Sequence, residues 1–208
     1  MFLVGLTGGI GSGKSEASSI FKKIPNVYLI DLDEISKKIT KKNKPGFIKI
    51  IEKYGNYYLN PAKELDRNKI QTDIFNSKKI KKDIEGILHP IIYRSCIDEI
   101  KIITSQRKYY YTVIVIPLLF ESETYQDLVS ETLLIDCEEK TQVSRVQSRD
   151  NVSTQLINKI MSCQASREEK LRKADKIIDN NSQNISKLER DVIEYHENLI
   201  HNKLVNIK

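Results

Sequence analysis

The sequence predicts an α/β fold with one five-stranded parallel sheet, helices packed on its faces, a helical insertion and a helical lid. Short apolar runs without polar alternation suit strands that are buried on both faces of a parallel sheet. Stretches with helical periodicity separate these runs, and a glycine-rich turn joins the first run to the first helix. At 208 residues the chain is long enough for one such domain with one or two insertions.

The first elements form a strand–helix–strand unit. Residues 2–7 are expected to be a buried strand, residues 8–13 a glycine-rich turn and residues 14–23 a helix. The apolar run at 27–30 is the second strand, and it ends in the acidic stretch 31–33. This opening is typical of a layered α/β domain.

The remaining elements follow in the same alternation. Residues 34–106 are mostly helical in pattern, and a break at 54–65 begins the helical insertion. We also expect strands at 108–116, 131–137 and around 176–178, a charged helical stretch at 138–172 with a break near 150–153, and a last helix at 185–200. The predicted division is therefore a core of residues 1–60, 108–137 and 173–208, an insertion of residues 61–107 and a lid of residues 138–172.

The composition is typical of a folded globular protein, with 39% apolar and 30% charged residues. The net charge is +6 and the sequence pI is about 9.0. Two interpretations stay open: lysine-rich solvated helix faces, or a basic pocket for a polyanion such as a nucleotide. Because the basic residues are scattered and no nucleic-acid-reading motif occurs, we expect no nucleic-acid partner.

The three cysteines, Cys96, Cys137 and Cys163, have neither a metal-ligand spacing nor the even number of a disulfide framework. The apolar N-terminal run is short, lacks a basic region and leads directly into glycines, so it predicts a strand and not a signal peptide. No apolar stretch approaches the roughly 18 residues that a membrane helix needs. We therefore expect a cytoplasmic protein without a membrane partner, either a monomer or a weak homo-oligomer.

Residues 8–15 read Gly-Gly-Ile-Gly-Ser-Gly-Lys-Ser, which matches the G-x-x-x-x-G-K-[ST] pattern of a phosphate-binding loop, or P-loop. The glycines let backbone N–H groups converge on phosphate oxygens, and the following helix presents its positive end to the same anion. Lys14 is expected to bridge the β- and γ-phosphates of ATP, and the Ser15 hydroxyl to bind Mg²⁺. The pattern therefore predicts a P-loop three-layer fold that binds a nucleotide.

The other motifs favour a kinase over a guanine switch or a motor. No N-K-x-D base reader occurs, and the apolar strand at 112–116 ends in Pro117 where a motor ATPase usually has Asp-Glu. The acids follow the second strand, at Asp31 and Asp33, and the carboxyl ends of parallel strands are where ligands bind. One carboxylate there is expected to accept the proton of an attacking hydroxyl, whereas the other could simply cap the following helix.

Three arginines predict a mobile lid. Arg145 and Arg149 lie four residues apart on one helix face, and Arg167 follows the helix break. Surface ion pairs with neighbouring acids are the alternative for each single arginine. Together they are expected to close over the phosphates and exclude water.

The order and spacing of the motifs resemble the dephospho-CoA kinase family along nearly the whole chain. The matching segments are residues 5–15, 30–33, 88–90 (Leu-His-Pro), 116–121 (Ile-Pro-Leu-Leu-Phe-Glu), 142–150, 164–167 and 174–181. The resemblance implies transfer of the γ-phosphoryl group of ATP, with Mg²⁺, to the ribose 3′-hydroxyl of 3′-dephospho-CoA. It also implies that the insertion is a CoA domain.

The resemblance further implies roles for individual residues. The catalytic residues would be Asp33 as the base, Lys14 and Arg149. The nucleotide would be bound by Gly9, Gly11, Ser12, Gly13, Lys14, Ser15, Glu16, Arg145, Arg149 and Asn180. The acceptor would be bound by Asp31, Asp33, His89, Pro117, Leu118, Leu119, Phe120, Glu121 and Arg167. Without the resemblance, His89 before Pro90 would more often make a structural hydrogen bond.

Four positions depart from the usual family pattern: Glu16, Leu32, Lys37 and Ser182. None removes a catalytic group, so we expect an active enzyme. Two alternatives remain: a kinase with another small-metabolite or nucleoside-monophosphate acceptor, and a nucleotide-binding regulator or RNA-associated protein without activity.

Overall fold

A computed structural model describes residues 1–182 and 184–205 of the chain. The chain divides into two compact units, residues 1–30 with 106–208 and residues 31–105, which are described separately below as unit 1 and unit 2. Among the described residues, no helix is both long enough and apolar enough to cross a membrane.

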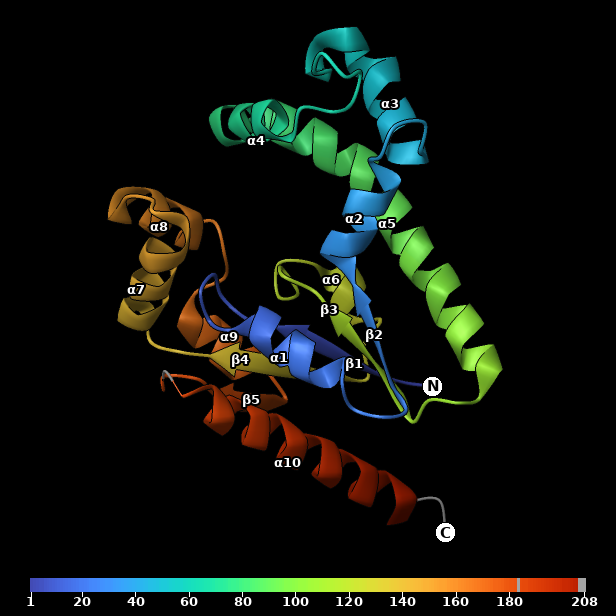
Figure 1. Cartoon of the computed structure of the whole chain (residues 1–208), viewed down its shortest axis with the longest axis vertical. Helices are drawn as coiled ribbons and strands as arrows, with labels where there is room; N and C mark the ends of the chain where they lie inside the picture. The colour runs from blue at the N-terminus through green and yellow to red at the C-terminus, as the bar shows by residue number, and fades with distance from the viewer. Residues whose placement is uncertain (183, 206–208) are drawn as a thin grey trace. The chain divides into compact units, whose positions relative to one another are not determined.

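Unit 1 is built on a five-stranded sheet with the strand order β2-β3-β1-β4-β5 (Figure 1). The strands are β1 (Phe2–Thr7), β2 (Val27–Asp31), β3 (Tyr111–Val115), β4 (Glu131–Asp136) and β5 (Lys176–Asp179). The pairs β1–β3, β1–β4 and β4–β5 are parallel, so the carboxyl ends of these strands lie at one edge of the sheet. The predicted α/β fold with a five-stranded parallel sheet is confirmed.

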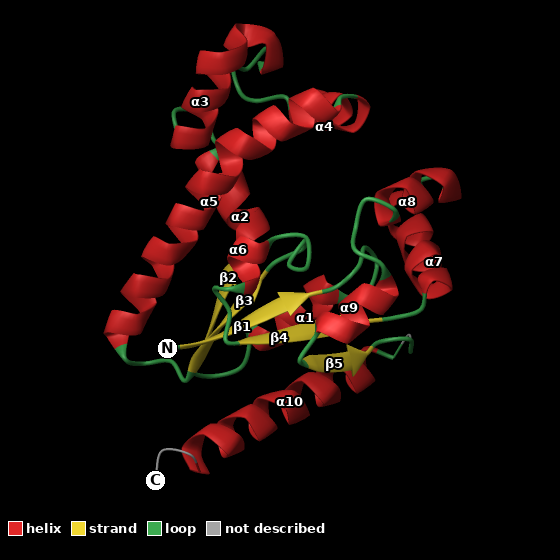
Figure 2. Cartoon of the chain, turned by 180° about the vertical axis from the view of Figure 1, so that it is seen from behind, coloured by secondary structure: helices red, strands yellow, loops and turns green. Residues whose placement is uncertain are grey.

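The helices of unit 1 cover the sheet on both faces. They are α1 (Lys14–Phe21), α6 (Glu123–Gln126), α7 (Glu139–Asp150), α8 (Thr154–Met161), α9 (Arg167–Lys173) and α10 (Ile185–Val205). Helices α1 and α10 pack together against alternate strand residues such as Val4, Leu6 and Val113, which are fully buried. Helix α9 packs on β4 from the other face (Figure 2). This arrangement fixes the loop between β1 and α1 at the carboxyl edge of the sheet.

Unit 2 is helical, as the sequence predicts for residues 34–106. It contains α2 (Leu32–Ile39), α3 (Pro45–Tyr54), the 3₁₀ helix η1 (Gly55–Tyr58), α4 (Arg67–Asn76) and α5 (Lys78–Gln106). Its core consists of the buried side chains of Phe47, Ile50, Tyr58, Leu65 and Ile84. The predicted break at 54–65 holds η1 and an isolated antiparallel bridge between Leu59 and Leu65.

Some element bounds differ from the predicted ones. Strand β3 begins at Tyr111 and not at residue 108, because α5 is followed by a turn in which Arg107 has a positive φ of 51°. The short helix α6 was not predicted. The compact unit 2 begins at Asp31, whereas the sequence placed the start of the acceptor domain at residue 61. The functional division stays a prediction, because compactness does not report which ligand each segment binds.

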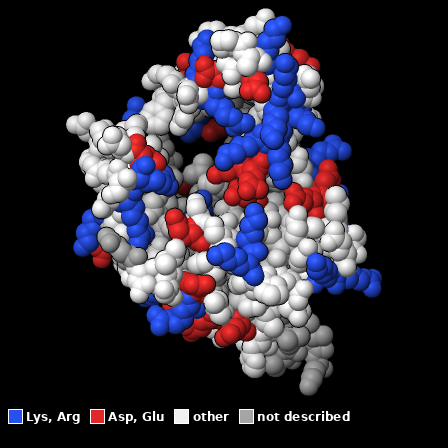
Figure 3. All heavy atoms as spheres, in the orientation of Figure 1, with Lys and Arg blue, Asp and Glu red and all other residues white. Residues whose placement is uncertain are grey.

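Charged side chains of both signs are interspersed on the face shown in Figure 3. This pattern fits the interpretation of lysine-rich solvated helix faces for much of the positive charge. In unit 2 the stretch at 37–44 contains five lysines, and all five are exposed.

Candidate active site

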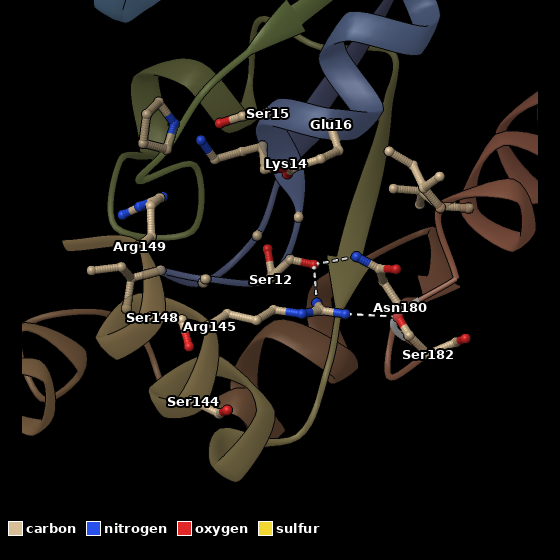
Figure 4. A pocket seen from close by; sticks show the side chains of 18 of the residues that line it. Ser12, Lys14, Ser15, Glu16, Ser144, Arg145, Ser148, Arg149, Asn180 and Ser182 are labelled. Atoms are coloured by element: carbon tan, nitrogen blue, oxygen red, sulfur yellow. Dashed lines mark hydrogen bonds between the residues drawn. The ribbon is translucent and has the colours of Figure 1, made fainter. Parts of the chain in front are cut away.

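Unit 1 has a cavity of about 720 Å³ at the carboxyl edge of its sheet (Figure 4). Its floor is the loop between β1 and α1, and its walls come from α7, from the segment after α8 and from the residues after β5. The lining residues are 8–16, Pro117, Ser144, Arg145, Ser148, Arg149, Gln164, Asn180, Ser182, Ile185 and Leu188. All ten residues predicted to bind the nucleotide therefore lie around one cavity.

The backbone of the loop requires glycine at specific positions. Gly13 has a φ of +98°, and a Cβ atom on it would lie 2.1 Å from Asn180 Nδ2. Gly11 has a φ of +73°, and a Cβ atom there would lie 2.7 Å from the backbone oxygen of Gln142. Both positions combine a left-handed backbone with a close neighbour, so any other residue would deform the loop.

The first turn of α1 presents unpaired backbone N–H groups to the cavity. Helix α1 begins at Lys14, and its N-cap Gly13 makes no side-chain capping hydrogen bond. The helix thus offers N–H donors and its positive dipole end to an anion. The side chains of Lys14 and Ser15 belong to the same cavity lining. These groups together form a site for phosphate oxygens.

Two predicted nucleotide-binding residues also brace the loop. Asn180 is buried, and its Nδ2 donates a 2.8 Å hydrogen bond to the backbone oxygen of Ser12. Arg145 donates from Nη1 to the same oxygen at 3.5 Å and from Nη2 to the backbone oxygen of Ser182 at 2.7 Å (Figure 4). The usual family pattern has glycine where this chain has Ser182. Because Arg145 contacts the backbone oxygen of this residue, the hydrogen bond does not depend on the serine side chain. Both residues therefore hold the loop as well as line the cavity.

Arg149 and Glu16 place opposite charges in the cavity lining. Arg149 donates to both carboxylate oxygens of its neighbour Asp150, at 2.8 and 2.7 Å. The hydrogen bond to Asp150 raises the pKa of the Arg149 guanidinium, and the Glu16 carboxylate adds to this effect. Glu16 is therefore close enough to act electrostatically on Arg149, which the sequence alone did not indicate.

Arg167 is held differently from the other two arginines. Its guanidinium makes a forked contact with Asp136, the last residue of β4, with Nη2 to Oδ2 at 2.7 Å. This hydrogen bond raises the pKa of Arg167. Among the described residues that line the cavity, Arg167 does not appear. Its predicted contact with the acceptor stays a prediction.

The sequence analysis missed Asp136 altogether. A signal was present, because Asp136 is the last acid of the strand predicted at 131–137, and acids at the carboxyl ends of parallel strands face the ligand edge. Asp136 is only 7% exposed. Next to it, burial raises the pKa of the Cys137 thiol to about 11. Burial also lowers the pKa of the nearby Lys170 ammonium.

Asp31, the last residue of β2, and Asp33, in the first turn of α2, both lie in unit 2. Asp31 is the N-cap of α2, and its Oδ1 accepts the N–H groups of Asp33 at 2.8 Å and of Glu34 at 3.3 Å. The helix-cap alternative is thus confirmed for one of the two carboxylates. Asp33 lies in the first turn of α2 and is exposed.

The other predicted acceptor residues divide by exposure. His89 is exposed within α5, where the helix continues through Pro90. In the segment 117–121, Pro117 lines the cavity, Leu118 and Glu121 are exposed, and Leu119 and Phe120 are buried. Buried side chains shape the segment from inside, so a direct contact with a ligand is open to Pro117, Leu118 and Glu121.

The residues around the cavity suit Mg²⁺ that is bound together with substrate phosphates, and not a metal whose ligands all come from the protein. In the ranges 1–182 and 184–205, no group of three or more His, Cys, Asp or Glu side chains is arranged to hold a metal. Mg²⁺ usually keeps several waters and binds through one or two protein oxygens and substrate phosphates. The Ser15 hydroxyl at the cavity wall fits that requirement.

Comparisons with known proteins agree with this geometry. The dephospho-CoA kinase family profile matches residues 2–186. A dephospho-CoA kinase from Gamma-proteobacterium EBAC31A08 is 38% identical over 205 residues, 99% of this chain and 98% of that protein. The dephospho-CoA kinase of Shewanella oneidensis is 37% identical over 94% of this chain and 92% of that protein.

Two solved structures share the fold. The dephospho-CoA kinase from Campylobacter jejuni has a TM-score of 0.70 and 26% identity, covering 97% of this chain and 98% of that one. A Thermus thermophilus protein has a TM-score of 0.78 with 23% identity, covering 97% of both chains, and shows likeness of fold alone.

Proposed function

The chain belongs to the dephospho-CoA kinase family, and from that premise we propose that it transfers the γ-phosphoryl group of ATP to the ribose 3′-hydroxyl of 3′-dephospho-CoA. The products are ADP and coenzyme A, so the reaction is the last step of coenzyme A synthesis. The observation that carries this proposal is the cavity of unit 1, whose loop amides, Lys14 and two arginines surround a space suited to a triphosphate.

The phosphates of ATP are bound by the loop and by the lid. The backbone N–H groups of residues 9, 11 and 13–15 surround the β-phosphate, and Lys14 bridges the β- and γ-phosphates. Arg149 approaches the transferring group from α7, where its positive charge stabilises the charge that develops on the phosphoryl oxygens. Asn180 and Arg145 hold the loop in its binding conformation and lie on the side where the base and ribose sit. Glu16, beside them, balances part of the positive charge.

Mg²⁺ is the cofactor that this arrangement fits, with the Ser15 hydroxyl as its protein ligand. When bound, the ion neutralises the phosphate oxygens and orients the γ-phosphate for transfer. The lining of the cavity does the rest: it positions the triphosphate and limits the access of water.

Asp33 acts as the general base in this proposal. Its carboxylate accepts the proton of the 3′-hydroxyl as that oxygen attacks the γ-phosphorus and the bond to the β–γ bridging oxygen breaks. Support comes from its position directly after β2, in a helix turn that is fixed by the Asp31 cap. Asp31 Oδ1 accepts a hydrogen bond from the backbone N–H of Asp33. Asp31 therefore orients Asp33 even if Asp31 itself makes no contact with the acceptor.

The remaining acceptor contacts are proposed from the family resemblance. His89, Pro117, Leu118 and Glu121 are accessible enough to touch the acceptor, while Leu119 and Phe120 support the same segment from inside. The reaction takes place in the cytoplasm in this proposal, which the three free cysteines support. A monomer or a weak homo-oligomer, without nucleic acid, is sufficient for the activity.

A coupled ADP-release assay tests the proposal directly. We expect ADP formation that requires dephospho-CoA and is abolished by EDTA. Adenosine monophosphate, other nucleoside monophosphates and shikimate serve as competing acceptors in parallel reactions. Rapid turnover of one of these, with none of dephospho-CoA, would overturn the proposed acceptor while leaving the phosphate site intact.

A further inference from the structure

Asp136 is a buried acid at the nucleotide edge of the sheet to which neither the motifs nor the proposed roles assign a task. It is 7% exposed, and it ends β4 beside the loop that forms the cavity floor. Arg167 Nε donates to both of its carboxylate oxygens at 3.1 Å, and Arg167 Nη2 donates to Oδ2 at 2.7 Å. A forked arginine–carboxylate contact fixes the orientation of both groups.

The backbone of Asp136 connects the same residue to the phosphate-binding loop. Its carbonyl oxygen accepts the N–H of Asn180 at 2.7 Å. The Asn180 side chain in turn donates to the carbonyl of Ser12 inside the loop at 2.8 Å. Asp136 therefore contacts Arg167, the first residue of α9, through its side chain and Asn180, which braces the loop, through its backbone.

The four residues that end at Arg167 are attached at further points. Gln164 lines the cavity, and its Oε1 accepts the N–H of Ile10 in the loop at 3.3 Å. The next amide, that of Ala165, donates to Glu121 Oε1 at 2.6 Å. Ser166 then caps α9. The segment 164–167 is thus bonded to the phosphate-binding loop at one end by Gln164 and to β4 at the other end by Arg167.

We propose that Asp136 is a positioning residue for phosphoryl transfer, acting through Arg167 to hold segment 164–167 and the Gln164 side chain against the phosphate-binding loop. This inference rests on the proposed function. Arg167 then serves the reaction as an anchor and does not need to touch the acceptor. A fixed segment at this place shields the γ-phosphate from water, so transfer to the acceptor exceeds hydrolysis.

Four variants test this role. Asp136→Asn and Arg167→Met each remove one side of the fork, and their double variant removes both. Arg167→Lys keeps the charge without the fork at a side chain that is 37% exposed, so it is expected to fold even if Asp136→Asn does not. The matched control is Glu169→Gln, because Glu169 forms a partly exposed 2.7 Å ion pair with Lys173 on the same helix.

The kinetic readout separates positioning from binding. We expect each fork variant to lower kcat with dephospho-CoA by roughly ten- to a hundredfold while the acceptor KM stays within about twofold. The double variant should lose no more than either single variant, because both residues act through one contact. The share of ADP released without acceptor should rise several-fold in the fork variants and stay unchanged in Glu169→Gln.

Hydrogen exchange tests the anchoring role without depending on which acceptor the enzyme uses. With ADP bound, hydrogen exchange at the amides of segment 164–167 should become faster in all fork variants and not in the control. If wild-type protein fails to use dephospho-CoA, this measurement still tests the anchor. Unchanged exchange in Arg167→Lys and Asp136→Asn would overturn the inference. So would a tenfold rise in acceptor KM for Arg167→Met with normal kinetics for Asp136→Asn, since Arg167 would then be an acceptor ligand.

Discussion

The cavities of the two units are built by opposite means. The cavity of unit 1 is formed by backbone amides and charged side chains, and hydrogen bonds between residues far apart in the sequence, such as Asn180 and Ser12, hold it together. Unit 2 has a cavity of about 390 Å³ that is lined mainly by isoleucine and leucine side chains, with Arg67 bonded to Lys37 and Thr40. In α4, one of its walls, no residue is buried.

The two cavities therefore differ in how far their walls can shift when a ligand binds. Polar cross-links of defined geometry keep the phosphate site pre-organised, so little reorganisation accompanies binding of ATP. Apolar packing between helices has no preferred direction and permits small shifts at little cost. We therefore expect substitutions in unit 1 to alter nucleotide binding sharply, and substitutions in unit 2 to act on stability and on the acceptor.

The largest effect is expected from Lys14→Met. Loss of the ammonium leaves the β- and γ-phosphates without their main side-chain cation, so kcat/KM for ATP should fall by about a thousandfold. The matched control is Lys22→Met, at the exposed C-cap of α1. A Lys14→Met enzyme that retained wild-type kcat/KM would show that the cavity of unit 1 is not the ATP site.

A pair of core truncations separates the contributions of the two units. Ile84 is buried in unit 2 and Leu133 in unit 1, and truncation of each to alanine should cost about 2–5 kcal/mol of local stability. Ile84→Ala should speed hydrogen exchange in residues 31–105 and leave ADP affinity unchanged. Leu133→Ala should weaken ADP binding, because β4 ends at Asp136, whose carbonyl oxygen holds the backbone of Asn180, and Asn180 braces the loop. Equal loss of ADP affinity in both variants would show that the nucleotide site does not depend on unit 1 alone.

Two glycine substitutions are expected to have the smallest effects: one lowers the affinity for ADP and the other raises the free energy of unfolding. Gly13→Ala should weaken ADP binding by at least about tenfold, because the left-handed backbone alone costs roughly 1–2 kcal/mol and Asn180 is displaced. Gly86→Ala lies within α5 with no heavy atom within 4 Å of its Cβ position, and should raise unfolding stability by about 0.5–1 kcal/mol. Isothermal titration with ADP and chemical denaturation measure the two changes. The reverse pattern would contradict the assignment of a rigid site to unit 1.

The parts of the fold that the sequence predicts well are those set by neighbouring residues. The strand, glycine turn and helix of residues 2–21 carry their own signals of burial, backbone freedom and helical period. The sequence also predicts that Asp31 or Asp33 caps the following helix. An N-cap side chain bonds to amides only two and three residues away, so this contact is local as well. The short helix α6 has too few residues for a periodic pattern.

The features of the site that the sequence does not predict are hydrogen bonds between residues far apart in the sequence. Asp136 and Arg167 are 31 positions apart, and neither residue alone indicates the fork that joins them. Likewise, Asn180 bonds to a loop residue 168 positions earlier. Such contacts arise only when the parallel strands bring their carboxyl ends to one edge. The sequence therefore predicts which residues gather there, but not which of them hold one another.

We propose that the Asp33 carboxylate is the base that removes the proton from the acceptor hydroxyl. The most direct test measures kcat with dephospho-CoA and ADP affinity for Asp33→Asn, beside Glu34→Gln, an exposed acid in the same helix turn. We expect kcat to fall at least about a hundredfold in Asp33→Asn with ADP affinity unchanged, and both to stay normal in Glu34→Gln. Near wild-type turnover by Asp33→Asn would contradict the account.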